Sequence, residues 1–206
     1  MALHEWIKAV YLDDKKILQL QRRFQKARPF EHLALPNFFV EEKIADVLIA
    51  LSSESFERKE SDLFACSQTK DLASSQSKTL VAFRAFLCSD EFTSYLESLT
   101  GVDIKAGVID MAGTIYGDTD HLLCHDDKLE GRSIAYMIYF TSLKKKDGGA
   151  LCLYESRNGR PTRIVKRIMP QANMFAFFKV APVSFHQVDE VLQDVQRIAI
   201  SGWFHG

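Results

Sequence analysis

The amino-acid sequence predicts an α+β fold that is mainly β: a jelly-roll barrel buttressed by N-terminal helices. Two observations lead to this prediction. Apolar residues recur at helical spacing in the first half of the chain, whereas the part after about residue 105 is a series of short segments rich in β-branched and aromatic residues. The gaps between these segments leave no room for the crossover helices of a doubly wound α/β fold. We therefore expect one domain over residues 1–206, with 1–105 as mostly helical support and 106–206 as the β core.

The helical prediction for the first half rests on three segments. Residues 4–27 carry apolar side chains at helical spacing, with a charged break at DDKK (13–16). Residues 41–53 are amphipathic and follow LPNFFV (35–40). A third helix is expected over 90–100, because Ser89 is a typical N-cap residue and Gly101 a typical C-terminal stop. The polar, serine-rich stretch at 57–79 is expected to be an irregular excursion.

The second half contains eight segments that are typical of strands, and glycine- or proline-containing turn signals separate them. These segments are 107–116, 121–127, 132–140, 149–155, 162–169, 173–180, 184–188 and 195–204. Short strands at such close spacing favour a two-sheet barrel over any layered α/β arrangement.

The composition excludes several classes of partner. The formal net charge is −1, so neither nucleic acid nor a membrane surface is expected to attract the chain. No apolar run approaches the ~20 residues that span a bilayer. The cysteines form no CxxC pair, which is typical of reduced thiols in the cytoplasm and argues against a disulfide framework. They are Cys66, Cys88, Cys124 and Cys152.

The segment CHDD (124–127) places an imidazole beside two acids in a stretch that otherwise resembles a strand. If residues 122–127 are extended, His125 and Asp127 project to the same side, because side chains alternate along a strand. A nitrogen and a carboxylate oxygen directed at one point form a candidate half-site for a metal. The alternative for an isolated His-x-Asp tripeptide is a solvated strand end, since such tripeptides often arise by chance.

A second histidine, His186, lies in the predicted strand 184–188. On its own it is more typical of a hydrogen-bonded core histidine than of a ligand. With His125 and Asp127 it would complete a facial set of two imidazoles and one carboxylate, which leaves coordination positions open on a non-haem Fe(II). Structural zinc normally takes four ligands, and no fourth is apparent in the sequence.

Arg197 is the other residue with chemical significance. Strand alternation places it on one face with Ala199, Ser201 and Trp203. A buried guanidinium must be paired, or its burial costs several kcal/mol. It therefore either meets an internal acid or binds an anionic ligand, and its planar fork suits a carboxylate.

These residues, in this order, resemble the iron(II)- and 2-oxoglutarate-dependent dioxygenases of the prolyl hydroxylase group. The tail of the chain, after about residue 105, resembles the catalytic domain of the Tpa1/Ofd1-type ribosomal prolyl hydroxylases. The segments that carry this resemblance are GGALCLYE (148–155), NMFAFFKVAPVSFHQVDEV (173–191) and RIAISGWFHG (197–206). The resemblance implies a double-stranded β-helix fold and cytoplasmic prolyl hydroxylation of a ribosomal protein or translation factor, with release of succinate and CO2.

The resemblance also implies roles for particular residues. His125, Asp127 and His186 would bind Fe(II), and Arg197 would pair with the distal carboxylate of 2-oxoglutarate. Tyr139 and Tyr116 would flank that cosubstrate, and Trp203 would line its pocket; ordinary core packing is the alternative for all three. The resemblance further implies O2 as a co-reactant and ascorbate as a candidate reductant.

Other functions remain open at this point. One is the same chemistry on a small molecule or free amino acid, and another is a non-catalytic sensor that binds 2-oxoglutarate. A plain metal-binding barrel is the third, although it would not need Arg197.

Overall fold

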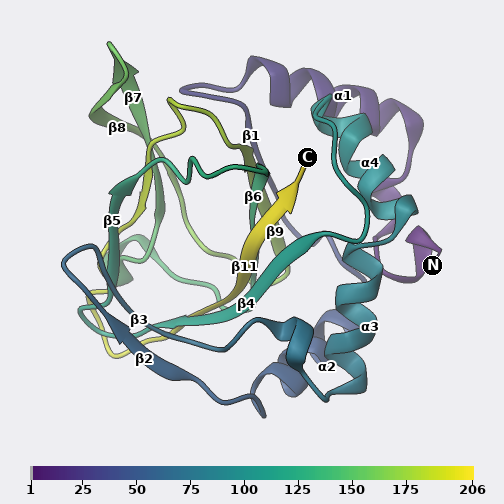
Figure 1. Cartoon of the computed structure of the whole chain (residues 1–206), viewed down its shortest axis with the longest axis horizontal. Helices are drawn as coiled ribbons and strands as arrows, with labels where there is room; N and C mark the ends of the chain where they lie inside the picture. The colour runs from purple at the N-terminus through teal and green to yellow at the C-terminus, as the bar shows by residue number, and fades with distance from the viewer. Residues whose placement is uncertain (1) are drawn as a thin grey trace.

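The computed structural model describes residues 2–206, in which a strongly curved antiparallel sheet has its α-helices gathered on one side (Figure 1). The helices are α1 (Asp14–Lys26), α2 (Glu41–Leu51), α3 (Lys78–Leu87) and α4 (Asp90–Thr100), with 3-10 turns η1 (Leu3–Glu5), η2 (Ala9–Tyr11), η3 (Leu72–Ser74) and η4 (Lys145–Asp147). The strands are β1 (His32–Leu35), β2 (Glu57–Glu60), β3 (Phe64–Gln68), β4 (Ile109–Tyr116), β5 (His121–His125), β6 (Arg132–Tyr139), β7 (Leu151–Arg157), β8 (Arg160–Ile168), β9 (Met174–Lys179), β10 (His186–Val188) and β11 (Arg197–His205).

Neighbouring strands follow the order β1-β9-β6-β11-β4-β3-β5-β10-β7-β8, and β2 pairs with β3 beside this path. Every ladder is antiparallel among the described residues. The sheet curls into a nearly closed barrel, and β1 and β8 are the two ends of this strand order. The predicted fold class is confirmed: a mainly β barrel, with helices from the first half of the chain covering one side.

Alternation along the strands divides the core in two. On β11, Ile200 and Phe204 face the helices and join a large cluster with aromatic residues such as Phe83, Phe92 and Phe175. Ala199, on the opposite face of β11, packs inside the barrel with a smaller apolar cluster. The period of two in a strand thus gives one sheet both a helix-covered face and an interior face.

The backbones of β4 and β11 approach each other closely at Gly202. A Cβ built on Gly202 would lie 1.8 Å from the carbonyl oxygen of Asp110, so no larger residue fits there. The register of this ladder pairs Arg197 with Tyr116 and Ala199 with Thr114. It therefore fixes which side chains of β4 face those of β11 inside the barrel.

The helix predicted over 90–100 is confirmed as α4. The Ser89 side chain accepts a hydrogen bond from the backbone N–H of Phe92, and Gly101 ends the helix with φ 67°. The segment 41–53 is confirmed as α2, which begins at Glu41 and ends at Leu51. Residues 4–27 differ from the prediction in their first part. They form two 3-10 turns before α1, which begins at Asp14 because Asp13 caps it.

The prediction of an irregular excursion at 57–79 is wrong. This stretch forms the β2–β3 hairpin, and β3 lies in the middle of the sheet, where it pairs with both β4 and β5. Its residues are mainly small and polar, so local composition gave no strand signal. Its partners β4 and β5, which lie far away in the sequence, stabilise this strand together with β2.

Two further elements have no counterpart in the sequence analysis: α3, and the edge strand β1, which pairs with β9. The eight predicted strands are all present, with ends shifted by a few residues. Within residues 2–206, no helix has both the length and the apolar character needed to span a membrane.

Candidate metal centre

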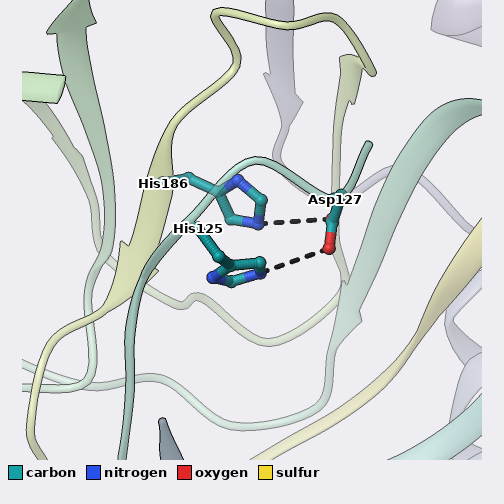
Figure 2. Close-up of side chains that lie close together, drawn as sticks. All are labelled: His125, Asp127 and His186. Carbon is teal, nitrogen blue, oxygen red and sulfur yellow. Dashed lines mark ion pairs between the residues drawn. The ribbon is translucent and has the colours of Figure 1, made fainter. Parts of the chain in front are cut away.

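Three side chains converge on one point (Figure 2): His125 and His186 from two neighbouring strands, and Asp127 from the loop that follows β5. His125 ends β5 and His186 begins β10, and the two are register partners in the β5–β10 ladder. His125 Nε2 lies 3.2 Å from one Asp127 carboxylate oxygen, and His186 Nε2 lies 3.3 Å from the other. One ligand atom from each residue lies within 4.8 Å of the others. The structure thus brings together the three residues that the sequence predicted would meet.

The geometry that brings Asp127 to this point differs from the predicted one. β5 ends at His125, so residues 121–127 are not one extended strand. Asp127 has φ 58°, a left-handed conformation that is uncommon outside glycine but that Asp tolerates better than most residues. The turn of the backbone, rather than strand alternation, directs the carboxylate to the two imidazoles.

The hydrogen bonds of the two imidazoles determine which nitrogen is free. His125 Nδ1 lies 2.8 Å from the carbonyl oxygen of Leu123, and His186 Nδ1 lies 2.9 Å from that of Ser184. A carbonyl only accepts, so each Nδ1 carries the hydrogen, and in the neutral ring the Nε2 lone pair faces the centre. This is the tautomer that a metal-binding histidine needs.

The Asp127 carboxyl is strongly favoured in its ionised form. Burial raises the pKa of Asp127, but hydrogen bonds and charges from both histidines outweigh it and hold that pKa well below its usual range. Burial lowers the pKa of His125, but the hydrogen bond and charge of Asp127 outweigh it and raise that pKa. The carboxylate is therefore ionised at any physiological pH and is available as an anionic ligand.

These donors fit Fe(II). Two imidazole nitrogens and one carboxylate oxygen are the facial set of non-haem Fe(II) enzymes, and they leave other coordination positions open. No fourth His, Cys, Asp or Glu joins this group within residues 2–206. A closed structural zinc site, which normally has four protein ligands, does not match this arrangement.

A cavity of about 360 Å³ extends from the three side chains into the barrel and reaches Arg197. Arg197 is 2% exposed; its Nε donates to the carbonyl oxygen of Gly149 at 3.0 Å and its Nη2 to the Tyr139 hydroxyl at 3.2 Å. No Asp or Glu of residues 2–206 forms an ion pair with it. Of the two explanations that the sequence left open, an internal acid is therefore excluded.

The two tyrosines predicted near Arg197 lie beside it. Its guanidinium carbon is 5.1 Å from the ring centre of Tyr116 and 4.9 Å from that of Tyr139. Tyr116 lines the cavity, whereas Tyr139 is fully buried behind Arg197 and accepts its hydrogen bond. Burial raises the pKa of both hydroxyls despite the nearby positive charge, so both stay protonated and can donate to an anion.

Trp203 hydrogen-bonds to Asp127, one of the three clustered residues. Its indole N–H donates to Asp127 Oδ2 at 3.0 Å, and the same oxygen faces His186. The guanidinium of Arg132 stacks on the Trp203 ring, with its central carbon 3.4 Å from the ring centre. Trp203 was predicted as a pocket residue, and the structure places it along the cavity as well.

Sequence reasoning missed several residues that line the cavity, among them Arg132, Cys66 and Gln68. Arg132 begins β6, and only the register of β6 against β11 brings it onto Trp203. The other two lie on β3, which the sequence analysis treated as a loop. An alternating search within FACSQ (64–68) would have placed Cys66 and Gln68 on one face.

Comparisons with known proteins agree with this geometry. Residues 111–205 match the model of the 2OG-Fe(II) oxygenase superfamily. The chain is 41% identical over 182 residues to prolyl 3-hydroxylase OGFOD1 of Mus musculus, and this alignment covers 86% of this chain and 33% of the relative. It is 35% identical over 195 residues to prolyl 3,4-dihydroxylase OGFOD1 of Ostreococcus tauri, covering 86% and 38%. The chain thus spans between 33% and 40% of the length of the curated relatives that it matches.

Among solved structures, a Pseudomonas putida prolyl-4-hydroxylase aligns with a TM-score of 0.70 at 13% identity, covering 92% of this chain and 98% of that one. A prolyl hydroxylase from Trichoplax adhaerens, in complex with a hypoxia inducible factor peptide fragment, gives 0.70 at 16% identity, covering 94% and 93%. At such low identity these likenesses concern the fold alone, and they confirm the predicted double-stranded β-helix barrel.

Proposed function

This chain belongs to the 2OG-Fe(II) oxygenase superfamily, and from that premise we propose that it is a prolyl hydroxylase that uses Fe(II), 2-oxoglutarate and O2. The observation that carries the proposal is the shared cavity. It has the His125–Asp127–His186 cluster in one part and the buried guanidinium of Arg197 in another. This guanidinium forms no ion pair with an Asp or Glu of residues 2–206. A dicarboxylate that chelates a metal with one end needs a cation for its other end.

Each residue has a role in this proposal. His125, Asp127 and His186 hold the metal through their Nε2 atoms and a carboxylate oxygen. Arg197 binds the distal carboxylate of 2-oxoglutarate, and the Tyr116 hydroxyl stands beside it in the cavity. Tyr139 orients Arg197 through the 3.2 Å hydrogen bond and lies close to the same carboxylate.

The remaining work of the protein is positioning and exclusion of water. The bound metal and cosubstrate supply hydroxylation of a C–H bond, coupled to oxidative decarboxylation of 2-oxoglutarate to succinate and CO2, and ascorbate is the proposed reductant. Trp203 holds Asp127 in its orientation, and the carbonyls of Leu123 and Ser184 keep both imidazoles in the metal-binding tautomer. The apolar interior cluster around Ala199 encloses the cavity and strengthens the electrostatic interactions inside it.

The proposed substrate is a prolyl residue in a protein, specifically a ribosomal protein or a translation factor in the cytoplasm. The names of the matched relatives support prolyl hydroxylation. The four cysteines of the chain are all free, which is compatible with a reducing compartment. The test is mass spectrometry of ribosomal proteins and translation factors after incubation with the chain, Fe(II) and 2-oxoglutarate. One added oxygen on a proline is expected, and turnover of free amino acids alone would favour a small-molecule substrate.

The metal ligands are tested by single substitutions. Asp127→Ala should abolish 2-oxoglutarate-dependent succinate formation and reduce Fe(II) binding measured anaerobically, because it removes the one anionic ligand. His121→Ala is the matched control, since His121 begins β5, the strand that leads to Asp127, and lies outside the cluster. Wild-type turnover in Asp127→Ala would contradict the assignment.

The role of Arg197 is tested through cosubstrate affinity. Arg197→Lys keeps the charge but loses the planar fork, and a charge-assisted bidentate contact contributes roughly 1.5–3 kcal/mol. We expect the apparent KM for 2-oxoglutarate to rise about 10- to 150-fold, while Fe(II) binding stays unchanged. An unaltered KM would exclude Arg197 as the cosubstrate ligand.

A further inference from the structure

A second cavity, of about 840 Å³, lies between α1 and the two edge strands of the barrel, β1 and β8. We call it the basic groove. It shares no lining residue with the cavity at the metal centre. Its wall on one side is α1, and the end of α1 leads through Ala27 and Arg28 into β1. Lys166 and Ile168 of β8 line the other side.

The charged side chains that line the groove are all positive. Six lysines and arginines line it, and no Asp or Glu does: Lys15, Arg22, Arg23, Lys26, Arg28 and Lys166. All six are exposed, and none forms an ion pair with an acid of residues 2–206. The chain as a whole has a net charge of −1, so this is a local concentration of unpaired cations. Such a surface attracts an anionic partner.

His32 also lines the groove but does not add to its charge. Burial lowers the pKa of the ring, the charge of Lys166 lowers it further, and a hydrogen bond to the carbonyl of Phe30 opposes both. The ring is therefore neutral at physiological pH.

The groove also offers unpaired backbone. β1 pairs only with β9, and β8 pairs only with β7, so each has one open edge. An open edge presents alternate N–H and C=O groups that can pair with an added strand. The positive side chains of α1 and β8 stand beside these edges.

The lining between the cations is aliphatic. Leu18, Leu33, Ala34 and Ile168 contribute to it, and no Phe, Tyr or Trp does. Single-stranded nucleic acid is normally held by successive bases stacked on several aromatic rings, and His32 is the single ring in the lining of this groove. Open strand edges, aliphatic contacts and cations together fit an extended peptide with acidic side chains.

We propose that the basic groove is a docking site for an extended, acidic segment of a partner protein, which adds as a strand to the open edge of β1 or β8. Its acidic side chains pair with the cations of α1 and β8, and its intervening side chains contact the aliphatic lining. The proposal does not depend on the metal centre, so its test needs neither metal nor cosubstrate.

The test measures binding by fluorescence anisotropy with labelled probes about ten residues long, the upper length of a typical strand. The first probe alternates glutamate and threonine, and it should bind the wild-type chain. The second is the same peptide with every backbone amide N-methylated, which keeps the charge but removes the N–H donors along both edges of the strand. It should bind more weakly, and equal binding of both probes would overturn the strand addition.

The matched variants change charge in two places. Arg22→Glu combined with Lys166→Glu reverses one cation on each side of the groove, and affinity for the glutamate-threonine probe should fall about tenfold or more. Lys145→Glu combined with Lys146→Glu makes the same change in net charge on exposed η4, outside the groove, and should have little effect. Circular dichroism of each variant confirms that it is folded.

Three further results would overturn the proposal. One is equal loss of probe binding in both double variants, which would indicate a general charge effect. Another is undiminished binding in the groove variant. The third is binding of an oligouridylate probe, but not of the acidic peptides, with loss in the groove variant, which would make the groove a nucleic-acid site.

Discussion

At the scale of single residues, the metal centre depends on side chains that make no contact with the metal in our assignment. Trp203 donates a hydrogen bond to one carboxylate oxygen of Asp127, and Arg132 stacks on the face of that indole. Partners of this kind orient a ligand, and their loss typically lowers metal affinity 10- to 100-fold. A ligand in a left-handed conformation, as Asp127 is, has particular need of such support.

Trp203→Phe tests this support, since phenylalanine keeps an aromatic ring for Arg132 but has no N–H for Asp127. We expect Fe(II) affinity in anaerobic titration to fall about tenfold or more, with the thermal midpoint little changed. Tyr11→Phe removes a hydroxyl hydrogen bond outside the cavity and should bind Fe(II) normally. Wild-type affinity in Trp203→Phe would show that the hydrogen bond is dispensable.

At the scale of elements, a hydrogen-bonded chain joins three neighbouring strands next to the metal centre. Tyr154 of β7 donates to Gln187 of β10, and Gln187 donates to Asp189 at 2.7 Å. Arg167 of β8 donates to the other oxygen of Asp189 at 3.1 Å. β10 begins with His186, one of the proposed metal ligands. These hydrogen bonds therefore connect β10 to the β7–β8 hairpin, and β8 forms one wall of the basic groove.

The pH dependence of stability follows from Asp189. Burial raises the pKa of this carboxyl, but hydrogen bonds from Cys152, Gln187 and Arg167 outweigh it and lower that pKa. A carboxyl with a lowered folded-state pKa stabilises the fold above its unfolded value, near 3.9, and this stabilisation is lost as the pH falls below that value.

Asp189→Asn should therefore flatten the acid side of the stability profile. We expect the thermal midpoint of the wild type to fall more steeply between about pH 5 and about pH 3 than that of the variant. Asp194→Asn is the control, because Asp194 is exposed and forms no ion pair within residues 2–206. Parallel profiles of thermal midpoint against pH for wild type and Asp189→Asn would show that this carboxyl does not contribute to the loss of stability in acid.

At the scale of the whole molecule, the helices and the barrel share one aromatic core. Phe175 of β9 is fully buried, and its ring lies 5.1 Å from that of Phe38, 6.0 Å from that of Phe92 on α4 and 6.4 Å from that of Tyr136 on β6. The helices cover the outer face of the strands whose inner face lines the cavity. We therefore expect the two layers to unfold together.

Phe175→Ala should lower the free energy of unfolding by about 3–5 kcal/mol, since it removes a buried ring and leaves a cavity. Urea unfolding followed by circular dichroism and by tryptophan fluorescence measures it, and the two signals should change at one midpoint. Val165→Ala, at a 43% exposed position on β8, should change stability by no more than about 0.5 kcal/mol. Two separate midpoints would show that the helices and the sheet are independent units.

The sequence by itself determined the features that depend on local pattern. The Ser89 cap and the Gly101 stop gave α4, and alternation along β11 placed Arg197, Ala199 and Trp203 on the inner face, as observed. These features follow from the geometry of a single element, so neighbouring residues suffice to predict them. The identity of the three clustered residues also followed from residue type and order.

Only the tertiary structure decided the features that depend on distant partners. The strand β3 exists because β4 and β5 pair with it, and Arg132 reaches Trp203 because β6 has one particular register against β11. The basic groove joins α1 to β8, which are more than a hundred residues apart. The free energy that fixes such arrangements comes from pairing and burial between segments that a local pattern cannot relate to each other.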